Sequence, residues 1–306
     1  MLGSICVHTV GESAAMKKMF GVVARVAETK VTVLVTGESG TGKELVARAL
    51  HARSPRAGGP FVAINCAAIP ESLLESELFG RVKGAFTGAR AARSGLFVKA
   101  TGGTLFLDEV AEMPPGMQAK LLRALQERAV RPVGGDAETA FDARIVAATN
   151  RELETEVAER RFRADLFYRI NVVHVRIPPL RERENDVLLL AQSFLERCQA
   201  RGAARVVGFK SAAAERLVRY PWPGNVRELQ NCIECAVALS ECDRIGVEDL
   251  PERVRRFNAS MLPIDASHHS ASLSLEQVQR QHVVQVLESL GSPGRMPRAL
   301  PFAERP

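Results

Sequence analysis

The sequence predicts an α/β fold with a parallel five-stranded sheet covered by helices on both faces, followed by an all-helical domain. Near-continuous apolar runs rich in valine and isoleucine, typical of strands buried on both faces, alternate with helix-like stretches. This alternation indicates a parallel sheet between two helical layers. After the segment PPLRERE, which begins at residue 178, strand signals stop and helix-like stretches continue.

Five segments have the composition of buried strands. In chain order they are VTVLVTG at 31–37, FVAIN at 61–65, GTLFLDE at 103–109, ARIVAATN at 143–150 and NVVHVRI at 171–177. The intervening stretches KELVARALHAR and MQAKLLRALQER repeat apolar residues at spacings of three and four, which is the helical period. Beyond the last strand, DVLLLAQSFLERCQA, SAAAERLVRYPW and NVRELQNCIECAVALS are predicted as helices.

These patterns divide the chain into four parts. We predict an α/β domain at 1–178, a helical domain at 179–250, a linker at 251–272 and a last segment at 273–306. The linker contains Pro, Ser and the pair His268 and His269. We interpret the two histidines as solvated residues, because no further metal ligand lies near them in the sequence.

Composition limits the classes of function. The chain has 306 residues, of which 46% are hydrophobic and 25% charged, as in ordinary globular proteins. It contains no window of the roughly 20 apolar residues that span a membrane, and its start lacks a secretory signal. We therefore expect a cytoplasmic protein without a membrane partner. The net charge of +6 permits nucleic acid or nucleotide as a partner without establishing either.

The six cysteines are expected to be reduced thiols, because the chain is long and has no export signal. Cys232 and Cys235 form a CxxC pattern followed by Cys242, which on its own could indicate zinc or redox chemistry. We interpret them as residues of a helix, because neither a second CxxC nor paired histidines accompany them.

The motif GESGTGK follows the first predicted strand and opens a helix. This arrangement surrounds a phosphate with backbone N–H groups and the helix N-terminus, and Lys43 is expected to reach the β and γ phosphates. A bare glycine-rich turn is the alternative, but the full spacing after a buried strand favours nucleotide binding. The generic motif continues with a magnesium-binding Ser or Thr, whereas this chain has Glu44, which leaves the metal's protein ligand open. The predicted nucleotide-binding residues are Gly37, Glu38, Ser39, Gly40, Thr41, Gly42, Lys43 and Glu44.

Polar residues end two further predicted strands. Asp108 is a candidate magnesium ligand, directly or through water, and Glu109 is a candidate for polarising the attacking water. Thr149 and Asn150 end another strand and are candidates for sensing the γ phosphate. Acids at strand ends are often merely solvated, but ligands bind at the carboxyl edge of parallel sheets, which favours the functional interpretation.

Arg163 and Arg169 lie in RRFRADLFYRINV, just before the fifth predicted strand. Arginines stabilise the charge that develops on a transferring phosphoryl group, from the same chain or from a neighbour. Surface salt bridges are the alternative for isolated arginines. The predicted nucleotide site nearby favours a role in phosphoryl transfer.

The stretch GAFTGA is predicted to form a loop, because its glycines raise the entropic cost of order and only one side chain can pack well. The loop presents a single aromatic residue. Its residues are Gly84, Ala85, Phe86, Thr87, Gly88 and Ala89.

These motifs occur together with NCAAIPESLLESELFG, QAKLLRALQER, AATNREL, FRADLFYRINV, PPLRERENDV and YPWPGNVRELQN. The set resembles the central ATPase domain of bacterial enhancer-binding proteins, the sigma-54-dependent transcriptional activators of the NtrC type, within the AAA+ superfamily. The resemblance runs almost continuously from about residue 10 to 250. It implies a three-layer AAA+ P-loop sandwich with a helical lid, and ATP and Mg²⁺ as cofactors. Glu44 in place of Ser or Thr is normal for this family.

The resemblance implies what the GAFTGA loop contacts. In the family this loop is the tip of a projection from the ATPase ring, so Phe86 and Thr87 are expected to touch the sigma-54 factor and promoter DNA. ATP binding and hydrolysis move the loop, and the closed complex of RNA polymerase holoenzyme with the promoter becomes open. Residues 133–139 correspond to the second pore-side loop.

The resemblance also implies roles in the ATP site. Lys43 and Thr41 bind phosphate, Asp108 supports magnesium, and Glu109 activates water. Asn65, in INCAA, would restrain Glu109 until the γ phosphate is sensed.

Other residues would act from the lid or from a neighbouring subunit. Arg227 of the lid would be a second sensor, and Arg163 and Arg169 would be fingers that reach the site of the next subunit. Because the fingers come from another chain, the resemblance implies self-association into a ring, usually a hexamer.

The chain departs from the family pattern at three places. Arg81 and Val82 stand where the family often has His-Glu, which removes an acid beside the loop. Only about ten residues precede GESAAM, so no receiver domain is expected in this chain. LEQVQRQHVVQVLESLG resembles the opening helix of a helix-turn-helix, but the Pro-rich end GSPGRMPRALPFAERP predicts a truncated remnant at 273–306, which puts enhancer DNA as a partner in doubt.

Two alternatives to an ATPase that opens sigma-54 promoters fit parts of the sequence. A different AAA+ machine, such as an unfoldase or clamp loader, is disfavoured by GAFTGA and by the PWPGNVREL lid. A nucleotide-dependent sigma-factor-binding protein without turnover or enhancer binding is disfavoured by the intact Lys43, Asp108, Glu109 and both arginines.

Overall fold

The computed structural model describes residues 11–85, 91–202 and 206–257. Within these residues the central sheet has five parallel strands in the order β2-β5-β8-β1-β9. All five predicted strands are confirmed, and four of them are trimmed at both ends. Their bounds are Val33–Thr36 (β1), Phe61–Asn65 (β2), Thr104–Asp108 (β5), Arg144–Thr149 (β8) and Val173–Arg176 (β9).

The prediction that all five strands are buried on both faces is wrong for the two outer ones. Every residue of β8 is buried, and so are all but the last residues of β1 and β5. By contrast, β2 and β9 each contain only one buried residue. An outer strand has a neighbour on one side only, so it is less covered than a central one. Apolar runs predict the strands but not their order in the sheet.

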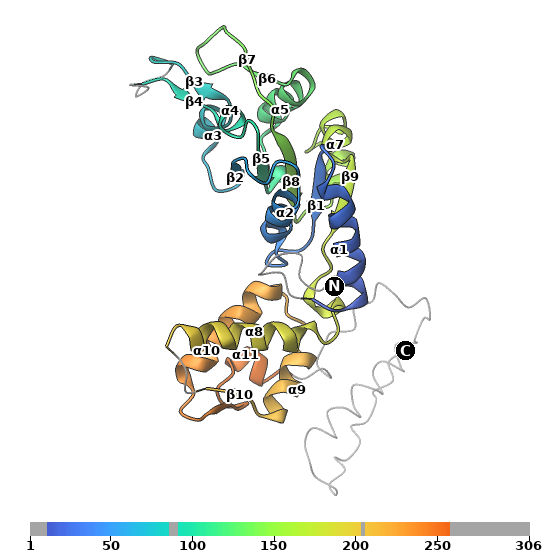
Figure 1. The fold of residues 1–306 in the computed structure, drawn as a ribbon, viewed down its shortest axis with the longest axis vertical. Helices are drawn as coiled ribbons and strands as arrows, with labels where there is room; N and C mark the ends of the chain where they lie inside the picture. The colour runs from blue at the N-terminus through green and yellow to red at the C-terminus, as the bar shows by residue number, and fades with distance from the viewer. Residues whose placement is uncertain (1–10, 86–90, 203–205, 258–306) are drawn as a thin grey trace, which may run out of the picture. The chain divides into compact units, whose positions relative to one another are not determined.

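The alternation of side chains along the central strands builds two separate cores. Val33 and Val35 of β1 belong to one core with helices α1 (Ala14–Ala27) and α2 (Lys43–Ala52). Leu34, between them, belongs to the other. Because successive side chains of a strand point to opposite faces, each face of the sheet buries its own helical layer. The predicted three-layer arrangement is confirmed (Figure 1).

In the described part of the chain, five helices pack on the face of the sheet that contains Leu34. They are α3 (Glu71–Phe79), α4 (Leu96–Lys99), α5 (Pro115–Glu127), α6 (Leu153–Ala158) and α7 (Ala164–Ile170). The 3-10 turn η1 (Val110–Glu112) connects β5 to α5. This layer therefore contains the turn that follows the predicted acid pair and also the segment with the two candidate arginines.

Residues after 178 form a separate apolar core around the fully buried Trp222. The helices here are α8 (Asp186–Ala200), α9 (Ser211–Arg219), α10 (Asn225–Leu239) and α11 (Glu252–Arg255), preceded by the turn η2 (Leu180–Glu182). The three predicted helices are confirmed. The structure adds a two-residue parallel pair, β10 (Gly208–Phe209) with β11 (Arg244–Ile245).

The CxxC segment lies in α10, as predicted. Cys232 is buried and Cys235 is exposed. Burial raises the pKa of the Cys232 thiol to about 12, which disfavours the thiolate that metal binding and redox chemistry need. His268, His269 and the predicted remnant at 273–306 lie outside the described residues. In the part of the chain that the structure describes, no helix is long and apolar enough to cross a membrane.

Arg144, at the start of β8, holds the ends of two helices against the sheet. Its side chain is 2% exposed. Nη1 donates to the carbonyl oxygen of Ala27 at 2.8 Å, and Nη2 donates to that of Val26 at 2.8 Å, at the end of α1. Nη1 also lies 3.5 Å from the carbonyl oxygen of Leu50 in α2. A cation suits these positions, because the last carbonyls of a helix lack partners within the helix and carry the negative end of its dipole.

We predict that Arg144→Met lowers the free energy of unfolding by about 2 to 4 kcal/mol, because the carbonyl of Ala27 loses its recorded donor and the contacts to Val26 and Leu50 are lost, while the apolar stem is kept. Urea denaturation followed by circular dichroism measures the change. Arg25→Met is the matched control: Arg25 is an exposed residue of α1 that donates to Gly21, and its loss should cost about 0.5 kcal/mol or less. Equal losses for the two variants would contradict the assigned role.

Candidate functional site

A cleft of about 590 Å³ collects most of the residues that the sequence predicts for the ATP site, although Gly37, Glu38, Thr149 and Asn150 are not among the described residues that line it. Its walls come from the glycine-rich loop, from the carboxyl ends of β2 and β5, and from α8 and α10. This is the edge at which open parallel sheets bind ligands. The predicted residues that line it are Ser39, Gly40, Thr41, Gly42, Lys43, Glu44, Asn65, Asp108, Glu109 and Arg227.

The glycine-rich loop needs two of its glycines for physical reasons. Gly40 has φ of 78°, and a Cβ atom there would lie 2.3 Å from the carbonyl oxygen of Gly224. Gly42 has φ of 101° and precedes the first residue of α2. Both values lie in the left-handed region that residues with a side chain rarely adopt. The sequence therefore permits a tight loop that directs the N-terminus of α2 into the cleft.

Lys43 joins the loop to the end of β5. Its ammonium group donates to the carbonyl oxygen of Gly37 at 3.1 Å and lies 3.4 Å from Oε1 of Glu109. The Lys43 side chain is 7% exposed and that of Glu109 is 17% exposed. A largely buried cation and anion thus face each other at the predicted phosphate position.

The acid pair lies at the carboxyl end of β5. Oδ1 of Asp108 accepts a hydrogen bond from the backbone N–H of Glu109 at 3.0 Å. Burial, and after it the negative charge of Glu109, raises the pKa of Asp108, and the charge of Lys43 opposes this. Glu109 has φ of 50°, a left-handed conformation that costs energy for a non-glycine residue and is found at functional sites.

Neighbouring strand ends surround the acid pair. Asn65 is the register partner of Asp108, and its Oδ1 accepts from the backbone N–H groups of Ala67 and Ala68 at 2.9 and 3.1 Å. The recorded hydrogen bonds of the Asn65 side chain therefore stabilise the turn after β2. The restraint of Glu109 by Asn65 stays a prediction.

The end of β8 contacts Glu109 directly. The backbone N–H of Asn150 donates to Oε2 of Glu109 at 3.3 Å. Thr149 is fully buried, and its hydroxyl accepts from the backbone N–H of Arg151 at 3.0 Å. The structure therefore brings this predicted strand end beside the acid pair.

Asn225, which the sequence reasoning missed, ties the lid to the glycine-rich loop. It is fully buried, and its Nδ2 donates to Oε2 of Glu38 at 2.9 Å and to the carbonyl oxygen of Ser39 at 3.1 Å. Its Oδ1 accepts from the backbone N–H of Leu180 at 2.8 Å. Arg227, two residues on, donates through Nη1 to the Ser39 hydroxyl at 3.3 Å. The asparagine in the PGN turn was a signal that could have identified this contact.

Two arginines of PPLRERE were also missed. Arg181 pairs with both carboxylate oxygens of Glu38, at 2.5 and 2.9 Å, and this pairing lowers the pKa of Glu38. Arg183 is 2% exposed and donates to the carbonyl oxygen of Thr41 at 3.0 Å. Burial lowers the pKa of Arg183 to about 10, so it stays charged at neutral pH. From the lid side, Arg183 thus holds the backbone of the loop and Arg181 holds its Glu38 side chain.

The two candidate arginines of the α7 segment are absent from the described residues that line this cleft. Arg163 precedes the first residue of α7, and its exposed guanidinium pairs with Asp165 at 2.7 Å. Nη2 of Arg169 donates to the carbonyl oxygen of Leu125 at 2.8 Å. Neither side chain acts on the cleft of its own chain in this structure.

The GAFTGA segment is described only at its start, because Phe86, Thr87, Gly88 and Ala89 lie outside the described residues. Short antiparallel strands β3 (Gly80–Arg81) and β4 (Arg93–Ser94) flank it, and the hairpin β6 (Ala129–Val130) with β7 (Thr139–Ala140) lies beside them (Figure 1).

Two backbone hydrogen bonds join these hairpins. The N–H of Val82 donates to the carbonyl of Val133 at 3.1 Å, and the N–H of Val133 donates to the carbonyl of Gly80 at 2.9 Å. Gly134, with φ of 75°, lies directly against Ala85. Residues 80–85, which lead into GAFTGA and include its first two residues, are thus supported by the predicted second loop at 133–139.

Two family descriptions match the chain. Residues 9–176 match the Sigma-54 interaction domain, and residues 181–265 match the AAA+ ATPase lid domain. The transcriptional regulatory protein ZraR of Klebsiella oxytoca is 49% identical over 283 residues, which is 92% of this chain and 63% of ZraR. The regulatory protein AtoC of Escherichia coli is 47% identical over 284 residues, or 92% of this chain and 62% of AtoC. The chain thus spans less than two thirds of these relatives.

Solved structures show the same arrangement. NtrX from Brucella abortus in complex with ATP has a TM-score of 0.74 at 34% identity, covering 94% of this chain and 64% of NtrX. The complex of NtrX with ADP gives 0.76 at 35% identity, covering 90% and 61%. Together with the matched domain, these likenesses confirm the family that the motifs predicted. The chain therefore belongs to the sigma-54 interaction domain family, the AAA+ ATPase domain of sigma-54-dependent transcriptional activators.

Proposed function

We propose that this chain hydrolyses ATP in a ring oligomer and uses hydrolysis to convert the closed promoter complex of sigma-54 RNA polymerase into the open complex. The observation that carries the proposal is the single cleft that joins the phosphate loop, Lys43, the acid pair and Arg227 of the lid. That the similar NtrX structures contain ATP and ADP supports nucleotide as the ligand. In this proposal residues 1–178 are the ATPase domain and 179–250 the lid.

Within the proposed site, Lys43 and Thr41 bind the β and γ phosphates. An incoming γ phosphate competes with the carboxylate of Glu109 for the Lys43 ammonium, which is 3.4 Å away. Glu109 is then free to accept a proton from the attacking water, and the N–H of Asn150 holds its other oxygen. Arg227 and the end of β8 sense the phosphates from two sides.

The acid pair also suits a magnesium ion. The described residues contain no group of three His, Cys, Asp or Glu side chains that could hold a metal alone. Mg²⁺ is commonly held by one or two carboxylates together with phosphate oxygens and water, which fits Asp108 at the cleft. Burial, and after it the negative charge of Glu109, raises the pKa of Asp108, and a bound cation would oppose both effects. When bound, the ion neutralises charge on the phosphates.

The ring supplies what one chain lacks. Arg163 and Arg169 do not line their own cleft, and the Arg163 guanidinium is exposed. We assign them to the cleft of the next subunit, where arginines stabilise the charge of phosphoryl transfer. The GAFTGA loop contacts sigma-54 and promoter DNA through Phe86 and Thr87, and residues 133–139 support the base of this loop.

We predict that Lys43→Ala abolishes ATP binding, whereas Glu109→Ala still binds ATP and loses turnover by about 100-fold or more, because only the water-activating group is removed. Steady-state phosphate release and fluorescent-nucleotide binding measure the two effects. Lys17→Ala, on an exposed turn of α1, is the charge-matched control and should behave as the parent.

Turnover should also rise more steeply than linearly with protein concentration, since fingers from a second chain are needed. A parent protein that binds ATP but shows no turnover at any concentration would contradict the proposal. It would favour the alternative of a sigma-binding protein without hydrolysis.

We predict that Phe86→Ala keeps ATP hydrolysis within about twofold but loses binding to sigma-54, because the substitution removes the loop's aromatic contact and leaves the cleft intact. The measurement is a gel shift of sigma-54 on premelted promoter DNA, with ADP and aluminium fluoride as the transition-state mimic. Leu239→Ala, an exposed apolar residue at the end of α10, is the control and should retain the shifted complex. A shifted complex of undiminished amount with Phe86→Ala would overturn the loop assignment.

A further inference from the structure

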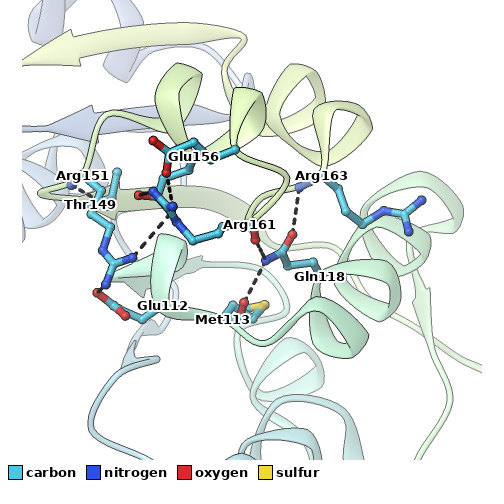
Figure 2. Close-up of polar contacts among 9 residues, drawn as sticks. Glu112, Met113, Gln118, Thr149, Arg151, Glu156, Arg161 and Arg163 are labelled. Carbon is cyan, nitrogen blue, oxygen red and sulfur yellow. Dashed lines mark hydrogen bonds and ion pairs between the residues drawn. The ribbon is translucent and has the colours of Figure 1, made fainter.

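Gln118, near the start of α5, is a fully buried amide whose hydrogen bonds join two functional segments. Its Nε2 donates to the carbonyl oxygen of Met113 at 2.8 Å and to that of Arg161 at 3.0 Å. Its Oε1 accepts from the backbone N–H of Arg163 at 2.9 Å. Figure 2 shows this bridge, with the Arg163 side chain extending away from it. Two donors and an acceptor on one planar group are what an amide offers and a carboxylate does not.

One end of the bridge leads back to the catalytic acid. Met113 follows η1, and η1 begins directly after Glu109. The N–H of Glu112 donates to the carbonyl oxygen of Glu109 at 3.0 Å, which closes the turn. The carbonyl that Gln118 holds therefore lies at the end of the short turn that begins at Glu109.

The other end of the bridge fixes the base of a proposed finger. Arg163 is the residue before α7, so its own backbone sets where its side chain starts. The preceding turn is tightly held: the N–H groups of Arg161 and Phe162 both donate to the carbonyl of Glu156, at 2.9 and 3.1 Å. Arg160 there has φ of 58°. Without Gln118, the N–H of Arg163 would lose its recorded partner.

A second connection runs parallel to the first (Figure 2). Arg151 follows β8, and its Nη2 lies 2.6 Å from Oε1 of Glu112. Its Nη1 lies 3.5 Å from Oε2 of Glu156, which also accepts from Arg161 at 2.7 Å. Glu156 is 6% exposed, so this charge is held by its arginine partners rather than by water. Both connections end in the turn before Arg163.

We propose that Gln118 is a positioning residue for Arg163: it ties the backbone of the finger to the turn that follows Glu109. This inference rests on the proposed function, in which Arg163 serves the ATP site of the next subunit. Neither Gln118 nor Met113 is among the described residues that line the cleft, so we expect the loss of Gln118 to act mainly on hydrolysis in the neighbouring subunit. A residue that only stabilises the fold has no such directional effect.

The test uses Gln118→Met, which keeps the length of the side chain and removes its hydrogen bonds. The ATP affinity and KM should stay within about twofold of the parent, while kcat falls roughly 10- to 100-fold, as expected when a catalytic group is misplaced by about 1 Å. Gln192→Met is the matched control, because Gln192 is an exposed glutamine of α8 that donates to Glu196. Its kcat should equal that of the parent.

Mixed rings reveal the direction of the effect. Gln118→Met has an intact acid pair and a misplaced finger, whereas Glu109→Ala has an intact finger and no water-activating acid. In an equal mixture, about a quarter of the sites combine an intact acid with an intact neighbouring finger, because the ring contacts are head to tail. The mixture should therefore recover up to about a quarter of the parent rate, although each protein alone is nearly inactive.

A mixture of Arg163→Ala with Glu109→Ala distinguishes a failure of the Gln118 inference from a failure of the proposed ring mechanism. If this pair recovers activity and the Gln118→Met pair does not, Gln118 does not act through the neighbouring site, and the inference fails alone. If neither pair recovers, the finger itself does not act between subunits, and the proposed ring mechanism fails with it. Unchanged kcat in Gln118→Met would also overturn the inference.

Glu156→Gln provides an independent variant should Gln118→Met unfold. It keeps the shape of the side chain and weakens the contact with Arg161. A kcat loss of about 10-fold is expected, because a charged hydrogen bond becomes neutral, and the mixture with Glu109→Ala should again recover about a quarter of the parent rate. Loss of kcat without recovery beside Glu109→Ala would contradict the second connection and, with it, the assignment of the turn as the base of the finger.

Discussion

The parallel pairing of β5, β8 and β1 is the constraint on which the candidate site depends. Parallel strands end at the same edge, so the residues that follow them meet although they are far apart in the chain. The pairing continues beyond the strands, because the N–H of Gly37 donates to the carbonyl oxygen of Thr149. At the neighbouring pair of β2 with β5, the N–H of Cys66 donates to the carbonyl oxygen of Asp108. The phosphate loop, the acid pair and the end of β8 are therefore neighbours by backbone geometry before any side-chain contact is made.

Features set by local sequence could be predicted, and features set by the approach of distant segments could not. Gly40 and Gly42 are needed by the backbone of one loop, and Asp108 directly follows an apolar run, so both were visible in the sequence. The low burial of β2 and β9 follows from strand order, which no apolar run encodes. Asn225 contacts Glu38 across 187 positions, and Gln118 contacts Arg163 across 45, so neither spacing forms a pattern.

The lid holds the glycine-rich loop through Glu38, Ser39, Gly40 and Thr41. Arg181 and Asn225 both bind the carboxylate of Glu38, and Arg183 binds the carbonyl of Thr41 two residues before Lys43. In the proposed mechanism, a displacement of the loop by bound phosphate acts on the lid directly, through the half-exposed Arg181–Glu38 pair and the buried Asn225. The proposed lid sensor Arg227 adds to a connection that the protein already has.

Helix α5 connects the acid pair with the two segments that are proposed to act outside the cleft. It begins after η1, which starts at Glu109, and it ends directly before the hairpin β6–β7. The segment that follows β6 holds Gly80 and Val82, just before the GAFTGA segment, through backbone hydrogen bonds of Val133. At position 82 this chain has an apolar valine rather than an acid. Near the first turn of α5, Gln118 holds the base of Arg163. In the proposed mechanism, a shift of η1 on hydrolysis reaches the base of the loop and Arg163 together, because a packed helix moves as a unit.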